Sequence, residues 1–199
     1  MEIKQNGHHL ILGEIKDIIS GAMITDTHDE RYRQHLAGLL LDACGFARQD
    51  IQKGVEILVS ADTKKARMKI DFLVSVENKV CVLIKYAPGS LVTRWKSAIA
   101  LSRVILPYQI PIVVVTNGED AHILDGKTGQ CLGSGLDALP MRSDVVHRFN
   151  EFDFTPILPR TRNLALRIVY AFEVDGACPC DTDICRLELG DPAEIIPPP

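Results

Sequence analysis

The sequence predicts an α/β fold, in which a mixed β-sheet is flanked by helices. Two nearly apolar strands at 69–74 and 80–86 are joined by a turn at 77–79. The run 110–116 is almost continuously apolar, as expected of a strand that is buried on both faces. Helical patterns lie before and after the strand pair, and this alternation of strands and helices is typical of a layered α/β domain.

The first elements of the chain are an N-terminal strand and an amphipathic helix. Residues 8–19 alternate apolar runs with charges, which predicts an entry strand or a short hairpin. Thr27 and Glu30 have the spacing of a capping box, in which the threonine caps the helix and the glutamate reaches back to the cap. Apolar residues at helical spacing follow, and Gly45 is expected to end the helix.

An antiparallel meander is expected after this helix. The segment 55–59 has the character of a strand, and a polar turn at 61–66 links it to the central strand pair. A second helix is predicted over 91–106, where a proline ends it. The buried run comes next, and an Asn-Gly pair at 117–118 predicts a hairpin that leads into a short strand at 121–125.

The sequence changes character near residue 143. We therefore predict a domain over 1–142 and a C-terminal helical appendage over 143–199, which includes a cysteine cluster and a proline-rich tail. An amphipathic helix is expected over 160–172. The residues predicted for its apolar side are Leu164, Ile168, Ala171 and Phe172.

Composition limits the surfaces that this chain can present. The formal net charge of −4 gives no support to a chain-wide surface for nucleic acid or anionic lipid, but it leaves room for a local basic patch. No stretch approaches the roughly 18–20 apolar residues that span a bilayer, and the start of the chain lacks a secretory pattern. The six cysteines are then expected to be free thiols, so we predict a cytoplasmic protein without a membrane partner.

Two charged residues stand out on the central strands. Asp71 lies on the first strand and Lys85 near the end of the second. A buried charge is costly unless it is paired, hydrogen-bonded or bound to a metal. Together with the helix that carries Glu30, these strands resemble the PD-(D/E)xK nuclease fold. More closely, the chain resembles the N-terminal domain of the R subunit of type I restriction enzymes, over roughly 10–142.

The resemblance rests on four segments taken together in their order and spacing. They are SGAMITDTHDER at 20–31, ID at 70–71, IKYAPGS at 84–90 and PIVVVTNGEDA at 111–121. The fold that the resemblance implies is restriction-endonuclease-like, which agrees with the mixed sheet predicted from the pattern of elements.

The resemblance also implies a chemistry. In such nucleases carboxylates hold Mg²⁺, which activates water and stabilises the charge on the phosphate, and a lysine assists. Carried over by motif, Asp71 is the central metal ligand, Lys85 is the catalytic lysine and Glu30 is an accessory acid. DNA is the implied partner, and a homodimer would suit an enzyme that cuts two strands.

One position departs from the motif. The acid expected two residues before the lysine is Leu83, which shares a strand face with Lys85 and cannot bind Mg²⁺. Either another acid has moved into the site, with Glu56 on the neighbouring strand as the best candidate, or the protein is an inactive relative. In the second case the fold serves to bind nucleic acid or to assemble with proteins, and Asp71 and Lys85 are a leftover ion pair.

Basic residues supply candidate phosphate contacts on DNA. The predicted contacts are Lys64, Lys65, Arg67, Lys69, Arg94 and Lys96. A solvated strand-and-turn face is the commoner explanation for the first four, so the prediction depends on where the fold places them.

The C-terminal cysteines form a second candidate metal site. Cys178, Cys180 and Cys185 have a C-x-C-x4-C spacing, which could hold Zn²⁺ or part of an iron–sulfur cluster. Cys44 is the upstream candidate for a fourth ligand. It also lies on the apolar side of the first helix, where a buried free thiol is common.

Overall fold

The structure is a computed structural model, and it describes residues 10–177 and 183–187. Within these residues one mixed sheet has seven strands. Six follow one another in the spatial order β3 (Ile51–Ala61), β4 (Lys64–Val76), β5 (Lys79–Tyr86), β6 (Ile112–Thr116), β7 (Ala121–Asp125) and β8 (Cys131–Ser134). The seventh, β9 (Ile184–Leu187), pairs with β4.

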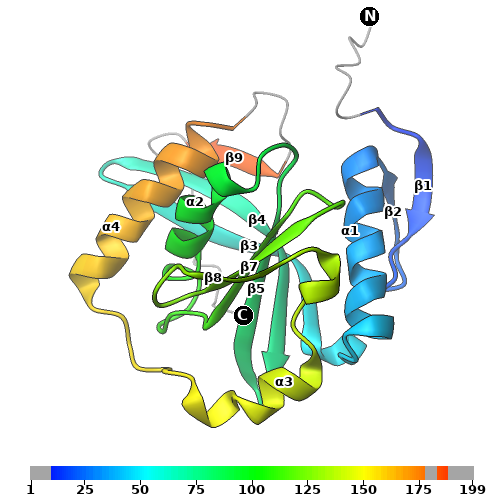
Figure 1. Ribbon diagram of the computed structural model, residues 1–199. Coiled ribbons are helices and arrows are strands. Elements are labelled where there is room, and N and C mark those ends of the chain that lie inside the picture. Colours follow the sequence, from blue (N-terminus) through cyan, green and yellow to red (C-terminus); the bar gives the residue numbers. More distant parts are fainter. Residues whose placement is uncertain (1–9, 178–182, 188–199) are drawn as a thin grey trace, which may run out of the picture.

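Helices cover both faces of this sheet (Figure 1). On one face lie α2 (Trp95–Leu101) and α4 (Pro159–Val169), and on the other lie α1 (His28–Gly38) and α3 (Arg142–His147). The three layers confirm the predicted α/β fold. No helix in the described part of the chain is long and apolar enough to cross a membrane.

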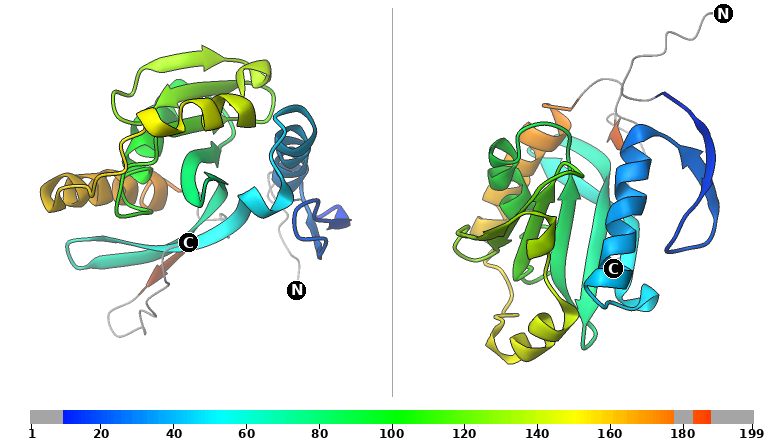
Figure 2. Two further views of the ribbon diagram at one scale, coloured as in Figure 1. Left: turned by 90° about the horizontal axis from the view of Figure 1, so that it is seen from below. Right: turned by 45° about the vertical axis from the view of Figure 1, so that its right-hand side comes forward.

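A small separate hairpin lies beyond α1 (Figure 2). Its strands are β1 (Gly13–Lys16) and β2 (Met23–Asp26), so the predicted N-terminal hairpin exists but is displaced from 8–19. Thr27 caps α1 as expected, because its Oγ1 accepts a hydrogen bond of 3.1 Å from the Glu30 backbone N–H. The Glu30 carboxylate does not reach back to the cap. It accepts hydrogen bonds from Gln34 and Lys53 instead, so only half of the capping box forms.

The predicted meander is present and the second helix is shorter than predicted. β3, β4 and β5 pair antiparallel, and the positive φ of Glu77 and Asn78 makes a tight turn between the last two. α2 ends at Leu101 rather than at 106. The Ser102 carbonyl accepts a hydrogen bond of 3.0 Å from the Ile110 backbone N–H, which turns the chain back toward β6. β5 and β6 then run parallel.

The sheet separates two hydrophobic cores. Leu83, Val113 and Val115 pack in the core shared with α2 and α4, whereas Ile84 and Val114 pack in the core shared with α1 and α3. β6 is buried along its whole length, as predicted. Each such aliphatic side chain contributes about 1.5–3 kcal/mol through burial, so these two strands hold the layers together.

The C-terminal helix packs with a different face from the one predicted. Its buried residues are Ala165 and Val169, followed by Tyr170, Glu173 and Val174 in a π-helical turn at 170–174. Leu164 and Phe172 are exposed instead. A shift of one residue rotates a helix face by 100°, and the π turn moves the phase further. The segment after 142 thus joins the same core, and β9 joins the same sheet.

Candidate functional site

Asp71 lies where β4 changes partners. Residues 72–76 of β4 pair with β5, whereas residues 65–68 pair with β9. At the fork, Oδ2 of Asp71 accepts a hydrogen bond of 3.0 Å from the backbone N–H of Tyr86. The carboxylate therefore replaces a ladder hydrogen bond, which helps to explain how a side chain that is only 3% exposed can be an acid.

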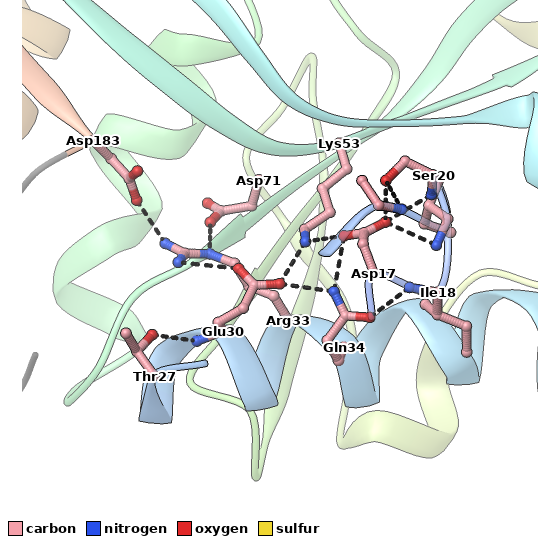
Figure 3. Close-up of polar contacts among 12 residues, drawn as sticks. Asp17, Ile18, Ser20, Thr27, Glu30, Arg33, Gln34, Lys53, Asp71 and Asp183 are labelled. Atoms are coloured by element: carbon pink, nitrogen blue, oxygen red, sulfur yellow. Dashed lines mark hydrogen bonds and ion pairs between the residues drawn. The ribbon is translucent and has the colours of Figure 1, made fainter. Parts of the chain in front are cut away.

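Two cations neutralise Asp71, and Figure 3 shows the first of them, Arg33. Arg33 from α1 donates from Nε to Oδ1 at 2.7 Å, and Lys85 from β5 places Nζ 3.3 Å from Oδ2. Burial opposes ionisation of Asp71, but Lys85, Arg33 and the Tyr86 N–H outweigh it and hold the pKa of Asp71 below its usual value. Burial likewise opposes the charge on Lys85, and Asp71 with Glu173 raises the pKa of Lys85.

A second ion network continues from the first along α1. Lys53 of β3 lies between the carboxylates of Asp17 and Glu30 and binds both. Gln34 donates to the same two acids, at 2.9 Å and 2.7 Å (Figure 3). Asp17 also accepts from the backbone N–H of Ser20. Burial opposes the charge of Asp17, yet Lys53 and these hydrogen bonds keep its pKa well below the ordinary value. Glu30 therefore binds Lys53 and Gln34 through its carboxylate, and only its backbone N–H takes part in the helix cap.

Two acids from the C-terminal segment complete the arrangement, and the sequence reasoning missed both. Glu173 places Oε2 3.9 Å from Nζ of Lys85 and is 7% exposed. Asp183 places Oδ2 3.0 Å from Nη2 of Arg33 and lies near Lys69. The spacing Ala165-Val169-Glu173 would have placed Glu173 on a buried face, had the helix phase been predicted correctly.

These residues line one groove of about 900 Å³. Among the residues that the structure describes, six carboxylates and five cations line it. The acids are Asp17, Asp29, Glu30, Asp71, Glu173 and Asp183, and the cations are Arg33, Lys53, Lys69, Lys85 and Arg94. The groove interior is therefore nearly balanced in charge, and it is not a basic channel.

The position that lacks the motif acid, Leu83, and the candidate to replace that acid, Glu56, both lie away from the groove. Leu83 is fully buried in the core shared with α2 and α4. Glu56 is exposed on β3, its register partner is Lys69, and it does not line the groove. The structure brings Asp71, Lys85 and Glu30 to one place, but it does not bring Glu56 there. The acid nearest to Lys85 after Asp71 is Glu173.

The predicted DNA contacts divide between two places. Lys69 and Arg94 line the groove, and Lys96 lies beside it with Nζ 5.7 Å from the centre of the Phe172 ring. Lys64 and Lys65 lie on the exposed start of β4, where Lys64 pairs with Asp175 at 3.4 Å. Arg67, further along β4, has Cys185 of β9 as its register partner.

The donor set does not fit a magnesium site as arranged. Both oxygens of Asp71 are engaged by cations, and Leu83 supplies no oxygen. In the described ranges no three His, Cys, Asp or Glu side chains gather so that they could hold a metal. The predicted Mg²⁺ therefore gains no support from this arrangement.

The cysteine site stays a prediction. Cys178 and Cys180 lie outside the described residues. Cys185 is exposed on β9, whereas Cys44 is buried in the core next to α1. Burial raises the pKa of the Cys44 thiol, which is the behaviour of a structural thiol and disfavours a thiolate ligand there.

Tyr86 is held in place from several sides. Tyr32 of α1 stacks on the Tyr86 ring, with ring centres 5.9 Å apart. The hydroxyl of Tyr86 donates a hydrogen bond of 3.0 Å to Asp29. Gly118, in the turn between β6 and β7, makes room for Tyr32, because a Cβ there would lie 2.3 Å from Cδ1 of the tyrosine. The turn therefore positions Tyr86, whose backbone N–H binds Asp71.

Comparison with known proteins identifies one family. A family model described as the type I restriction enzyme R protein N terminus matches residues 28–140. The matched segment contains Glu30, Arg33, Asp71 and Lys85, and it ends before Glu173. No curated protein and no solved structure matches the chain.

Proposed function

The chain belongs to the family of type I restriction enzyme R protein N termini, and on this premise we propose that it is a nuclease-like domain that binds DNA without cleaving it. The family supports the fold and the DNA partner. The geometry of the groove supports the loss of cleavage.

The observation that carries the proposal is that Arg33 and Lys85 occupy both carboxylate oxygens of Asp71. Mg²⁺ in nucleases is held by one or two carboxylates together with the substrate phosphate. Here a guanidinium, which keeps its charge at every accessible pH, donates to Oδ1 of Asp71 at 2.7 Å. The second carboxylate of the motif is absent, because position 83 is a leucine, and its side chain packs in the core.

A metal ion that displaced Arg33 from Asp71 would have to offset the free energy lost with the Arg33–Asp71 ion pair. Removing one partner of a buried ion pair costs about 3–5 kcal/mol, since the other charge is left uncompensated. A cost of that size would weaken metal binding roughly 150- to 5,000-fold. Arg33 is 18% exposed in its side chain, so solvent compensates for little of this cost.

DNA contact is supported by cations that take no part in the ion pairs of Arg33, Lys53 and Lys85. Arg94 and Lys96 pair with no acid among the described residues, and the same holds for Lys65 on β4. Each phosphate contact adds a salt-dependent term to the affinity. With a formal net charge of −4 over the whole chain, binding must depend on such a local group.

Cleavage and binding assays test the two halves of the proposal. Wild type, Asp71→Ala and Lys85→Ala are incubated with single- and double-stranded DNA in Mg²⁺ or Mn²⁺, and binding is measured by fluorescence anisotropy at two salt concentrations. We expect salt-dependent binding and no metal-dependent cutting. Cutting that both substitutions abolish would contradict the proposal and would identify Glu173 as the acid to substitute next. Absence of any DNA binding would favour a protein-assembly module instead.

A further inference from the structure

Phe172 is an exposed aromatic ring at the groove. It is 44% exposed, and none of the other large apolar side chains exposed in the described ranges is aromatic. The ring lines the same groove as Asp71 and Glu173. Its neighbours in the π-helical turn, Tyr170 and Glu173, are buried. The turn is therefore fixed by its buried residues, while the Phe172 ring is exposed to solvent.

Lys96 lies over this ring, and Arg94 belongs to the lining of the same groove. Nζ of Lys96 lies 5.7 Å from the ring centre, and Arg94, two residues earlier, lines the groove with it. Over 10–177 and 183–187 neither cation has an acid partner, whereas the groove cations Lys53 and Lys85 each bind two carboxylates. The cations without an acid partner are thus Lys96 at the ring and Arg94 in the groove lining, while the charges of Lys53 and Lys85 are already neutralised.

We infer that Phe172 is a stacking platform for one base of single-stranded DNA, and that Arg94 and Lys96 bind the flanking phosphates. The inference rests on the proposed DNA binding and names the form of DNA that the groove takes. A base in a duplex does not offer its face to a protein ring, but an unpaired base does, and stacking on an aromatic side chain tolerates any sequence.

The charge distribution favours a single strand over a duplex. The groove interior holds six carboxylates against five cations, so it offers no site for a second phosphate backbone. One backbone can contact Lys96 and Arg94 while its base stacks on the exposed part of the Phe172 ring. The apolar face of the base would then contact the Phe172 ring, and the phosphates would contact Arg94 and Lys96.

Anisotropy with a labelled oligothymidylate and a labelled blunt duplex tests the inference. The variants are Phe172→Ala, Phe172→Tyr, which keeps the ring, and Leu164→Ala as a control. Leu164 is 54% exposed on the same helix and does not line the groove. We expect Phe172→Ala to weaken single-strand binding roughly 5- to 150-fold, as loss of one stacked base predicts. Phe172→Tyr and Leu164→Ala should stay within about twofold of wild type, and duplex binding should not respond to any of the three.

The salt dependence tests the phosphate contacts separately. For single strands each lost contact lowers the slope of log K against log salt by about 0.7, so Arg94→Gln with Lys96→Gln should lower it by about 1.4. Lys127→Gln is the matched control, because Lys127 is 76% exposed and lies outside the groove. A slope unchanged from the control would contradict the phosphate assignment.

The outcomes separate this inference from the proposed function. Wild type that binds DNA, together with Phe172→Ala that behaves like Leu164→Ala, would overturn the platform and leave DNA binding intact. Loss of binding in Phe172→Tyr equal to that in Phe172→Ala would also overturn it. Wild type that binds neither oligonucleotide would overturn both. Because Phe172 is half-exposed, thermal melting of each variant should match wild type closely.

Discussion

Arg33 on α1 and Asp71 on β4 form a 2.7 Å ion pair that joins the helix layer to the sheet at its fork. The guanidinium also binds Asp183, and it lies 5.3 Å from the ring centre of Tyr86. Three separate parts of the chain therefore meet on one side chain. In a metal-dependent nuclease the carboxylate of Asp71 would be reserved for the ion, and here the protein's own cations use it.

Replacing Arg33 should destabilise the protein and free Asp71. We expect Arg33→Ala to lower the free energy of unfolding by about 3–5 kcal/mol, because the variant leaves buried Asp71 with one cation fewer. Urea unfolding measures this. The matched control is Arg31→Ala on the same helix, since the Arg31 side chain is 55% exposed and its pair with Asp26 should contribute far less. If Asp71 is a suppressed metal ligand, Mn²⁺ should raise the melting temperature of Arg33→Ala and not that of wild type.

The ionisation of Asp71 should make stability depend on acid pH. Its pKa is lower in the folded chain than the ordinary 3.8, so the unfolded chain takes up the proton first as pH falls. The stabilisation is complete above about pH 5 and is lost as pH falls through the folded pKa. Asp71→Asn should therefore be less stable than wild type at pH 7, and the difference should shrink near pH 3. Equal differences at both pH values would contradict this account.

Restoring the motif acid should not restore a nuclease. Leu83 is fully buried among apolar side chains of the core shared with α2 and α4. We expect Leu83→Glu to lower the free energy of unfolding by more than about 3 kcal/mol and to show no metal-dependent cleavage. Leu83→Met, which keeps the volume, should cost less than about 1.5 kcal/mol. Cleavage by Leu83→Glu would mean that position 83 faces the groove.

Gly118 should be sensitive to a single added methyl group for two reasons. Its φ is +91°, and a Cβ would collide with Tyr32. Gly135 has nearly the same φ, +93°, and no neighbour within 4 Å, so Gly135→Ala has the backbone strain alone. That strain costs on the order of 1–3 kcal/mol. We expect a lower melting temperature for Gly118→Ala than for Gly135→Ala, and the difference reports the contact that positions Tyr86.

The sequence allowed the strand pair, the turn between the strands and the meeting of Asp71 with Lys85 to be predicted, because these features depend on local pattern and on strands adjacent in sequence. It did not reveal Glu173 or Asp183. Glu173 depends on the phase of a helix that passes into a π turn, and a shift of one residue rotates the buried face by 100°. Asp183 reaches Arg33 through a pairing between β4 and β9 that spans more than a hundred residues. Such long-range pairing leaves no local signal.

The mistaken place for the extra acid has a similar cause. Glu56 was a reasonable candidate by strand adjacency alone, since its neighbour Val55 is paired with Ile70 on β4. The side chain nevertheless falls on the exposed side, while Lys53 reaches into the groove. Alternation along the strand decides between the two, because Lys53 and Glu56 are three positions apart and the pairing of β3 with β4 keeps one register across Gly54.

Gly54 has a consequence for association between copies of this chain. β3 is the edge of the sheet on its side in the described structure, and its 11 residues would form a long row of unpaired backbone groups. A straight edge of that length invites a strand from another molecule to extend the sheet, which is a common route to aggregation. The left-handed backbone at Gly54 breaks the row near its start, and Lys53 beside it is drawn into an internal ion pair. Gly54, which lines the groove, thereby also shortens the uninterrupted edge on which a second molecule could pair.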